Sequence, residues 1–265
     1  AAEGWNPGLD DLAAFRTADP DGLILGRLDG RPVGSISAVR YGERFGFLGF
    51  YIVIPQERGK GHGMALWTAA MDRFGDRIVG LDGVVDQQDN YRRSGFVLAG
   101  RNIRFTGPAP GSPPADDAAA VRPMEPDDLP AVLAYDRPFF ADERTGFLTA
   151  WVQPRAGVAR TCHVAARDGA ISGYGVIRAC RAGHKIGPLF ADDARTAEAL
   201  FLSLASTLRP GEQVSLDVPE ANGEGTRLAD RYGLSPSFET ARMYRGPAPE
   251  LPLPRTFGIT TFELG

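Results

Sequence analysis

The sequence predicts a mixed α+β fold in two domains, and three observations support this prediction. An apolar, β-branched run at 50–54 leads through a glycine-rich basic loop into a segment of helical composition, which predicts a strand, a loop and a helix. Residues 108–120 are rich in proline and alanine and lack large apolar side chains, as linkers do. Beyond them the order of predicted elements repeats. We therefore expect an N-terminal domain at 1–107, a linker at 108–120 and a C-terminal domain at 121–265.

Length, composition and charge limit the class of protein. A chain of 265 residues with a hydrophobic fraction of 43% can bury the cores of two domains. The net charge of −4, without a basic patch, argues against a nucleic-acid partner. No apolar run approaches the roughly 20 residues that span a bilayer, and the N-terminus has no signal-like apolar segment. These features predict a cytoplasmic protein without a membrane partner.

Cysteine and histidine are too sparse for a metal centre. Cys162 and Cys180 lie in separate apolar stretches without metal-ligand spacing, so buried reduced thiols are expected. His163 follows Cys162, but adjacent side chains on a strand point to opposite faces, which argues against a catalytic pair. We therefore expect no metal and no thiol nucleophile.

The first half alternates turn signals with strand and helix patterns. The Asp29-Gly30 pair marks a hairpin turn, and Gly95 ends a helix. The expected elements are a helix between 11 and 19, strands at 23–26, 32–41 and 45–54, a helix at 64–71, a strand at 77–81, a helix at 87–94 and a strand at 96–105.

The second half opens with a strand and helix that have no counterpart before Trp5, so we expect the first strand and helix of the first copy to be missing. The tail at 257–265 alternates like a strand and is expected either to close a sheet or to dock as a terminus. The other expected elements are a strand at 121–124, helices at 127–135 and 147–152, strands at 163–166, 171–178 and 185–190, a helix at 191–208, a strand at 213–218 and a helix at 222–232.

The loop of the first half has the features of an anion site. Alternate glycines let backbone N–H groups turn inward, a helix N-terminus follows, and Arg58 and Lys60 add positive charge, so a phosphate or pyrophosphate is the expected guest. A Walker A loop needs Ser or Thr after Gly-Lys, but Gly61 follows Lys60. A dinucleotide fingerprint needs G-x-G-x-x-G, whereas Gly59, Gly61 and Gly63 run G-x-G-x-G. A glycine-rich surface turn is the structural alternative.

Three features resemble the GNAT acyltransferase superfamily. Val53-x-Pro55 leads into Arg58-x-x-Gly61-x-Gly63, which is similar to the superfamily's acyl-CoA pyrophosphate loop, and Tyr91-Arg92-Arg93-Ser94-Gly95-Phe96 looks like its Tyr-x-x-x-Gly-Phe helix end. The tandem layout with a degenerate second copy resembles a bacterial type of two-domain GNAT protein. The resemblance implies two GNAT-like domains, each a mixed, mostly antiparallel sheet flanked by helices.

The resemblance also implies direct transfer of an acyl group from acetyl-CoA to an amine in a ternary complex. The pantetheine arm would lie along Tyr51, Ile52 and Val53, whose backbone would pair with it like an added strand. In the second copy the acidic pair Asp192-Asp193 stands at the equivalent helix start and would repel a pyrophosphate, so only the first copy is expected to bind CoA. The pyrophosphate would lie on the amides of Arg58, Gly59, Lys60, Gly61, His62, Gly63 and Met64.

Tyr91 matches the superfamily's general acid, a phenol that donates a proton to the departing CoA thiolate. The structural alternative is a tyrosine that closes its helix over the core. The family often has Asn eleven residues before the Gly of this motif, but Val84 stands there, and Asn222 occupies the slot in the second copy.

The amine also needs a base, because near its unperturbed pKa of about 10.4 it is protonated at neutral pH. Many relatives use a Glu on the long strand, which here contains no acid. Asp82 is the candidate that we choose, with Glu43 and Asp10 as alternatives. Its recurrence as Asp217 in the second copy also fits a structural role in capping a turn.

Other residues are candidates for the acceptor end. Trp5, Tyr41 and Tyr51 could line an acceptor pocket or belong to the core, and Asp136-Arg137 could reach across the domain interface or form a surface ion pair. The sequence as a whole predicts an N-acyltransferase for a small-molecule amine, acting as a monomer or homodimer. The alternative is a non-catalytic acyl-CoA sensor or scaffold.

Overall fold

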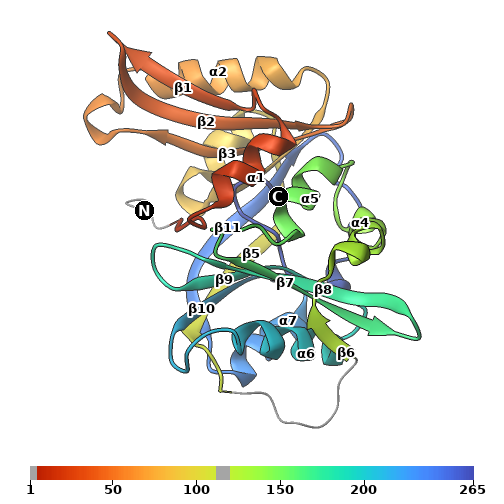
Figure 1. Ribbon diagram of the computed structural model, residues 1–265. Helices are drawn as coiled ribbons and strands as arrows, with labels where there is room; N and C mark the ends of the chain where they lie inside the picture. Colours follow the sequence, from red (N-terminus) through yellow and green to blue (C-terminus); the bar gives the residue numbers. More distant parts are fainter. Residues whose placement is uncertain (1–4, 112–119) are drawn as a thin grey trace.

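The computed structural model of the chain describes residues 5–111 and 120–265, and the predicted elements occur in it in the predicted order (Figure 1). The first half contains α1 (Asp11–Ala18), β1 (Leu23–Leu28), β2 (Arg31–Tyr41), β3 (Phe45–Val53), η1 (Pro55–Glu57), α2 (His62–Phe74), β4 (Ile78–Val84), η2 (Val85–Gln87), α3 (Gln88–Arg93) and β5 (Val97–Pro108). The second half contains β6 (Ala120–Pro123), η3 (Pro126–Asp128), α4 (Leu129–Asp136), η4 (Arg137–Phe139), α5 (Thr145–Val152), β7 (Arg160–Arg167), β8 (Ala170–Ala179), β9 (His184–Ala191), α6 (Ala194–Ala205), β10 (Gln213–Pro219), α7 (Gly223–Arg231), β11 (Ser235–Arg245), η5 (Leu253–Arg255) and β12 (Thr256–Gly258).

All these strands join one sheet. Its order is β1-β2-β3-β4-β11-β5-β10-β9-β8-β7-β6, with β12 paired to β9. Pairing is antiparallel except between β3 and β4 and between β9 and β10. The predicted fold class, a mixed and mostly antiparallel sheet flanked by helices, is therefore confirmed. The expectation of two separate sheets is wrong, because β11 joins the two halves.

β5, the last strand of the first half, and β11 of the second half each pair with strands of the other half. β11 lies between β4 and β5, and β5 lies between β11 and β10. The proposed limits 1–107 and 121–265 divide the sequence into two segments. In the middle of the sheet, however, strands of the two segments alternate in the order β4-β11-β5-β10. The proposed linker at 108–120 falls mainly on 112–119, outside the described residues.

This exchange predicts that residues 1–111 will not fold alone. Ala241 and Met243 of β11 are fully buried and pack in one cluster with Leu81 and Trp67, so removing β11 exposes that core and leaves an unpaired edge on β4. We expect the fragment to lack a cooperative thermal transition and to bind no acetyl-CoA, as checked by circular dichroism and calorimetry. A sharply melting fragment that binds acetyl-CoA would instead support an autonomous domain at 1–107.

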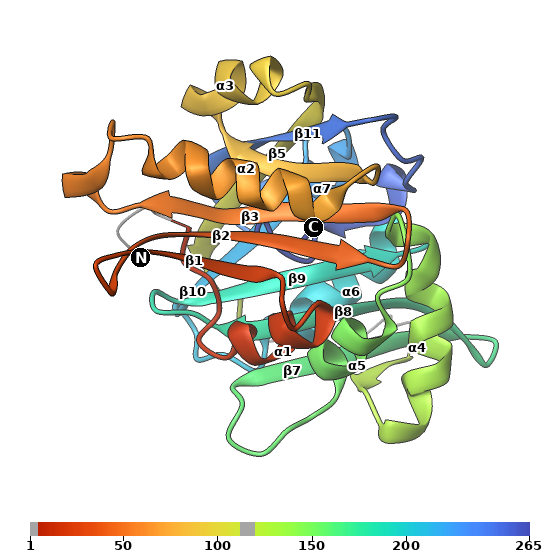
Figure 2. The same cartoon turned by 90° about the horizontal axis from the view of Figure 1, so that it is seen from above.

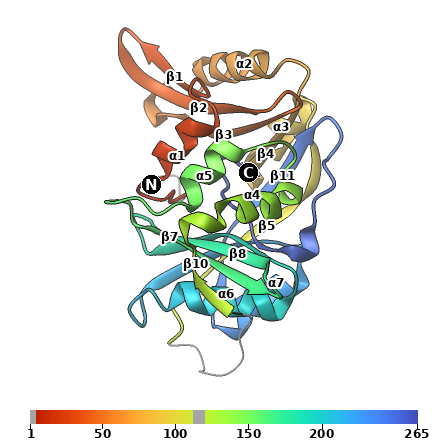
Figure 3. The ribbon, with the colours of Figure 1, turned by 45° about the vertical axis from the view of Figure 1, so that its right-hand side comes forward.

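The helices form three layers around the sheet. Helices α1, α4 and α5 lie between the two halves, α2 and α3 cover the outer face of the first half, and α6 and α7 cover the outer face of the second (Figures 1, 2 and 3). The central layer contains the largest buried cluster, in which Phe15 of α1 stacks on Trp151 of α5 with ring centroids 5.9 Å apart. None of the helices in the described ranges is long and apolar enough to cross a membrane.

The C-terminal tail first pairs as a strand and then enters the interior. β12 pairs with β9, the Nδ2 of Asn222 donates to the carbonyl of Thr256 at 2.9 Å, and the hydroxyl of Tyr41 donates to the carbonyl of Leu264 at 3.1 Å. The C-terminus accordingly lies near the centre of the molecule in all three views (Figures 1 to 3). The tail therefore joins the sheet through β12 and also docks as a terminus through its last residues, so both expected alternatives apply.

Candidate active site

The central feature of the candidate site is a gap between two parallel strands. β3 and β4 pair only from Phe45↔Ile78 to Leu48↔Leu81. Beyond that point the register of β3 against β2 shifts, and Phe50 adopts a φ of 46°, a bulge that turns β3 away from β4. A cavity of about 550 Å³ occupies the gap. The backbone of β3 beyond Leu48 therefore has no paired strand on this side within the described part of the chain.

The glycine-rich loop lies at one end of this cavity. Gly59 and Gly61 have φ of 75° and 88°, conformations that favour glycine, and Gly61 is the N-cap of α2. The first hydrogen bond of α2 runs from the amide of Ala65 to the carbonyl of Gly61 at 3.1 Å, so the amides of the preceding residues have no acceptor within the helix. The side chain of Arg58 is fastened to the end of β3 by a 2.8 Å bond from Nε to the carbonyl of Val53.

The residues predicted to bind the cofactor divide into two groups. Tyr51, Ile52, Val53, Arg58, Gly59 and Gly63 line the cavity. Lys60, Gly61, His62 and Met64 lie on the same loop and helix start but outside the cavity lining, and the Nζ of Lys60 is paired with Glu57 at 3.0 Å. Of the loop, Arg58, Gly59 and Gly63 therefore border the cavity, while the ammonium of Lys60 is held at the surface.

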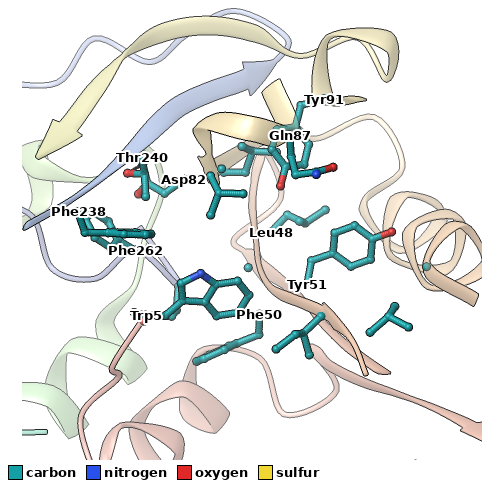
Figure 4. A pocket seen from close by; sticks show the side chains of 18 of the residues that line it. Trp5, Leu48, Phe50, Tyr51, Asp82, Gln87, Tyr91, Phe238, Thr240 and Phe262 are labelled. Carbon is teal, nitrogen blue, oxygen red and sulfur yellow. Dashed lines mark hydrogen bonds between the residues drawn. The ribbon is translucent and has the colours of Figure 1, made fainter. Parts of the chain in front are cut away.

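Tyr91 reaches the cavity from α3, on the side opposite β3 (Figure 4). Its ring stacks on Trp67 with centroids 5.7 Å apart, and a Cβ at Gly83 would lie 2.2 Å from the ring, so only glycine leaves room for it. Burial, with a smaller contribution from Tyr51, raises the pKa of Tyr91 to about 12, which keeps the phenol protonated at neutral pH. Among the described residues its hydroxyl has no hydrogen-bond partner. The structure thus holds a neutral, unoccupied proton donor in the cavity wall.

Asp82, our candidate base, lines the same cavity but its carboxylate is occupied. It accepts hydrogen bonds from Arg242 at 2.6 and 2.9 Å and from the Nδ2 of Asn102 at 2.8 Å, and its side chain is 0% exposed. Burial lowers the pKa of Arg242, but the charge of Asp82 more than offsets this, and the net shift is upward. This geometry favours Asp82 as an anchor that joins β4 to β11.

We expect Asp82→Asn to lower the free energy of unfolding by about 3 kcal/mol, because it leaves the buried guanidinium of Arg242 without its counter-charge. The pH profile of kcat/KM should keep its shape. Urea unfolding and pH–rate measurements check this, with Asp136→Asn as a control, since Asp136 forms an equally buried pair with Arg144 outside this cavity. Near wild-type stability together with loss of the acid limb of the profile would make Asp82 the base.

The other candidates lie elsewhere. Glu43 is exposed in the turn between β2 and β3, and the carboxylate of Asp10 accepts from the amide of Ala159 at 3.0 Å. Tyr41 is buried under Leu264 and does not line the cavity. Asp136 forms no surface ion pair with Arg137 but a buried one with Arg144. The described residues contain no cluster of three metal-ligating side chains, and Cys162 and Cys180 are free and buried.

Four aromatic side chains gather at the end of the cavity opposite the loop (Figure 4). Trp5 lies 6.5 Å from Phe50 and Phe238 lies 5.9 Å from Phe262, measured between ring centroids. Of these four, only Trp5 was a candidate from the sequence. We call Trp5, Phe50, Phe238 and Phe262 the aromatic wall.

Arg104 of β5 holds the aromatic wall together. Its guanidinium lies 4.7 Å from the ring centroid of Phe262, donates to the carbonyl of Trp5 at 3.0 Å and forms a two-point ion pair with Asp217. Burial raises the pKa of Asp217, but Arg104 more than compensates and the net shift is downward. Asp217, the counterpart of Asp82 in the second half, therefore has a structural role. Its partner Arg104 positions the aromatic wall.

Glu263 is a cavity residue that the sequence did not lead us to expect. This residue lines the cavity from the tail, is 3% exposed, and neither of its carboxylate oxygens has a hydrogen-bond partner among the described residues. Its carbonyl oxygen would lie 2.2 Å from a Cβ at Gly49, so the tail runs directly against β3 beside the bulge. Burial raises the pKa of its carboxyl above 4.5. A single acid in the tail gives no sequence signal for this placement.

The equivalent gap in the second half is filled by the chain itself. β9 and β10 pair only from His184↔Val214 to Ile186↔Leu216, and β12 then pairs with Phe190 and Leu189 of β9. The amide of Ile259 donates to the carbonyl of Asp217 at 2.9 Å. At the start of α6, Asp193 accepts from the amide of Thr196. The tail thus fills the gap between β9 and β10.

Comparison with known proteins places this geometry in a family. Residues 2–96 match the model of the acetyltransferase (GNAT) family, and residues 132–258 match that of an acetyltransferase (GNAT) domain. The chain is 31% identical over 264 residues to holothin acyltransferase of Pseudoalteromonas sp. (strain SANK 73390), covering 100% of this chain and 88% of the relative. The chain belongs to the GNAT acyltransferase family, and it has two GNAT domains.

Solved structures share the fold along nearly the whole chain. A putative acetyltransferase from Pyrococcus horikoshii has a TM-score of 0.80 at 23% identity, covering 97% of this chain and 84% of that one. A tandem GNAT protein from the clavulanic acid biosynthesis pathway has a TM-score of 0.64 at 19% identity, covering 94% and 92%. These likenesses establish the fold, while the family models and the sequence relative identify the protein as an acyltransferase.

Proposed function

We propose that the protein transfers an acetyl group from acetyl-CoA to the amine of a small molecule by direct attack in a ternary complex. The observation that carries this proposal is the open gap between β3 and β4, with the glycine-rich loop at one end and Tyr91 in its wall. The filled gap between β9 and β10 supports a single CoA site in the first half. The family models, which describe acetyltransferases, support acetyl as the group transferred.

In this proposal the pantetheine arm pairs with the free edge of β3 along Tyr51, Ile52 and Val53. The pyrophosphate lies on the amides between Arg58 and Met64, where backbone donors and the α2 dipole favour negative charge. Backbone N–H groups at the bulge polarise the thioester carbonyl. Binding therefore relies on backbone donors more than on Lys60 or His62.

The chemical step needs a base and an acid. The amine loses a proton, attacks the thioester carbonyl, and the C–S bond breaks as the phenol of Tyr91 donates its proton to the leaving thiolate. A protonated Tyr91 suits this role, because burial raises its pKa to about 12. The partner is then a small-molecule amine, with no nucleic acid or membrane, and the protein acts in the cytoplasm as a monomer or homodimer.

Release of the CoA thiol over a panel of amines, with holothin among them, tests the proposal. We expect release that depends on the concentration of one or more amines. The second candidate, a non-catalytic acyl-CoA sensor, is favoured by the absence of an acid on β3. Tight acetyl-CoA binding without amine-dependent release would establish the sensor, and turnover on any amine would eliminate it.

A further inference from the structure

The hydroxyl of Tyr51 lies against the first turn of α2. A Cβ at Gly63 would lie 2.7 Å from the Oη of Tyr51, and both residues line the candidate cavity. Figure 4 shows the ring of Tyr51 directed from β3 toward α2. Gly63 does not have a positive φ, so its backbone conformation suits other residues as well. A side chain at 63 would instead take the place of this hydroxyl.

Packing does not require the hydroxyl, as the second half shows. The pairing of β3 with β4 ends at Leu48, and that of β9 with β10 ends at Ile186. Three residues further on lie Tyr51 in the open gap and Leu189 in the filled one, and Leu189 is fully buried in the core of its half. An apolar side chain is therefore sufficient to cover the helix at this position. The hydroxyl occurs in the half that keeps its gap open.

The start of the helix differs between the halves in the same way. The N-caps of α2 and α6 are Gly61 and Asp193, so Arg195 takes the position that Gly63 has in α2. Where Leu189 replaces the tyrosine, a long side chain thus replaces the glycine. The close contact between a strand hydroxyl and a helix start is therefore a feature of the first half.

The hydroxyl of Tyr51 is a donor without a fixed partner. It makes no hydrogen bond to another residue in the described part of the chain. Burial raises the pKa of Tyr51 above its ordinary value, so the phenol keeps its proton at neutral pH. Trp67 lies beside both phenols of the cavity, with ring centroids 5.6 Å from Tyr51 and 5.7 Å from Tyr91. Tyr91 comes from α3 and Tyr51 reaches the start of α2, so the two phenols belong to different parts of the cavity wall.

We propose that the hydroxyl of Tyr51 donates a hydrogen bond to the pyrophosphate of acetyl-CoA, and that this contact contributes to the selection of CoA thioesters over thioesters without phosphate. The first hydrogen bond of α2 is donated by Ala65, so the amides of 62–64 have no acceptor within the helix. A hydroxyl beside Gly63 adds a side-chain donor to these amides. The proposal rests on the acetyl-CoA site proposed above.

Tyr51→Phe tests the contact with two acetyl donors, acetyl-CoA and S-acetylpantetheine, which has the same thioester and no phosphate. We expect the Kd for acetyl-CoA to rise and kcat/KM for acetyl-CoA to fall about tenfold, the loss expected for one hydrogen bond to a charged group. The value of kcat/KM for S-acetylpantetheine should stay within about twofold, because the phenyl ring keeps its place beside Trp67. Tyr232→Phe, whose hydroxyl lies outside the cavity and donates to Glu198, is the matched control and should change neither value.

Gly63→Ala tests the place of the hydroxyl. The added Cβ displaces the Oη of Tyr51, so the Kd for acetyl-CoA should rise about as much as in Tyr51→Phe. With Phe at 51 the nearest ring carbon lies 3.6 Å from this Cβ, an ordinary contact, so the double variant should bind acetyl-CoA within about twofold of Tyr51→Phe alone. A further loss of about tenfold in the double variant would show that the phosphate itself needs the space at 63, and would overturn this placement of the hydroxyl.

The outcomes separate this proposal from the acyl transfer. If no amine is acetylated, the Kd for acetyl-CoA decides, and a rise of about tenfold in Tyr51→Phe keeps the contact although the transfer fails. If amines are acetylated and Tyr51→Phe stays within about threefold of wild type in Kd and kcat/KM for acetyl-CoA, the contact is overturned and the transfer stands. An equal loss with both donors would place the hydroxyl at the pantetheine arm or the thioester, and would also overturn the proposal.

Discussion

Tyr91→Phe is expected to lower kcat for amine acetylation by at least about 100-fold while Kd for acetyl-CoA stays within about twofold. The substitution removes only the hydroxyl, and the ring keeps its stacking on Trp67 and its contact with Gly83. With a pKa of about 12, this phenol carries its proton throughout the neutral range, so the loss should be the same at mildly acidic and mildly alkaline pH. Steady-state kinetics and calorimetry measure the two parameters.

The control is Tyr232→Phe, at the end of α7 in the second half. Its hydroxyl donates to Glu198 and lies outside the cavity, so kcat should not change. If Tyr91→Phe keeps wild-type kcat, Tyr91 only closes α3 over the core, and the thiolate leaves without help from this residue.

Gly61→Glu is expected to weaken acetyl-CoA binding by at least about 100-fold. It places a carboxylate at the start of α2, where the helix dipole and the loop amides would hold the pyrophosphate, and like charges about 4 to 6 Å apart repel by several kcal/mol near a protein surface. An added Cβ meets nothing within 4 Å, so the effect is electrostatic and conformational rather than a clash. Calorimetric titration with acetyl-CoA is the measurement.

The backbone cost of this substitution has its own control. Gly211 has a φ of 86° against 88° for Gly61, and a Cβ there also meets nothing within 4 Å. The control variant is Gly211→Glu. Gly61→Glu and Gly211→Glu should each lose about 1–2 kcal/mol of stability, and only Gly61→Glu should lose acetyl-CoA binding. Unchanged binding in Gly61→Glu would remove the pyrophosphate from this loop.

The elements and the loop could be predicted because local chemistry determines them. The apolar run, the alternate glycines and the helix start that follow one another between 50 and 71 form β3, the loop and α2 almost where expected. The acidic helix start of the second half could also be recognised, since Asp193 accepts from the amide of Thr196 and caps α6. These signals depend on neighbours in sequence.

The exchange of β5 and β11 could not be predicted in this way. β11 begins Ser235-Pro236-Ser237, a weak strand signal. Its pairing with β4 and β5 places Ala241 and Met243 in the buried cluster that also contains Leu81 and Trp67, and sequence proximity does not predict this contact. A repeated element order indicates a duplication but does not say which copy a strand pairs with. The domain limits therefore remain a prediction.

The acids of the site show the same limit. Asp82 has the position of a base at the end of a strand, but its partner Arg242 lies 160 residues further along the chain. Glu263 has no motif around it, and only the course of the tail past Gly49 brings it to the cavity. Whether a carboxylate is paired depends on its burial and on residues distant in the sequence. A single sequence does not reveal these contacts.

Two-substrate initial rates of CoA thiol release, with acetyl-CoA and the best amine of the panel both varied, test the central claim most directly. Direct attack in a ternary complex predicts reciprocal plots that intersect, and no release above background without amine. Parallel plots, which indicate an acyl-enzyme intermediate, would contradict direct transfer. Tight acetyl-CoA binding with no amine-dependent release would contradict the enzyme itself.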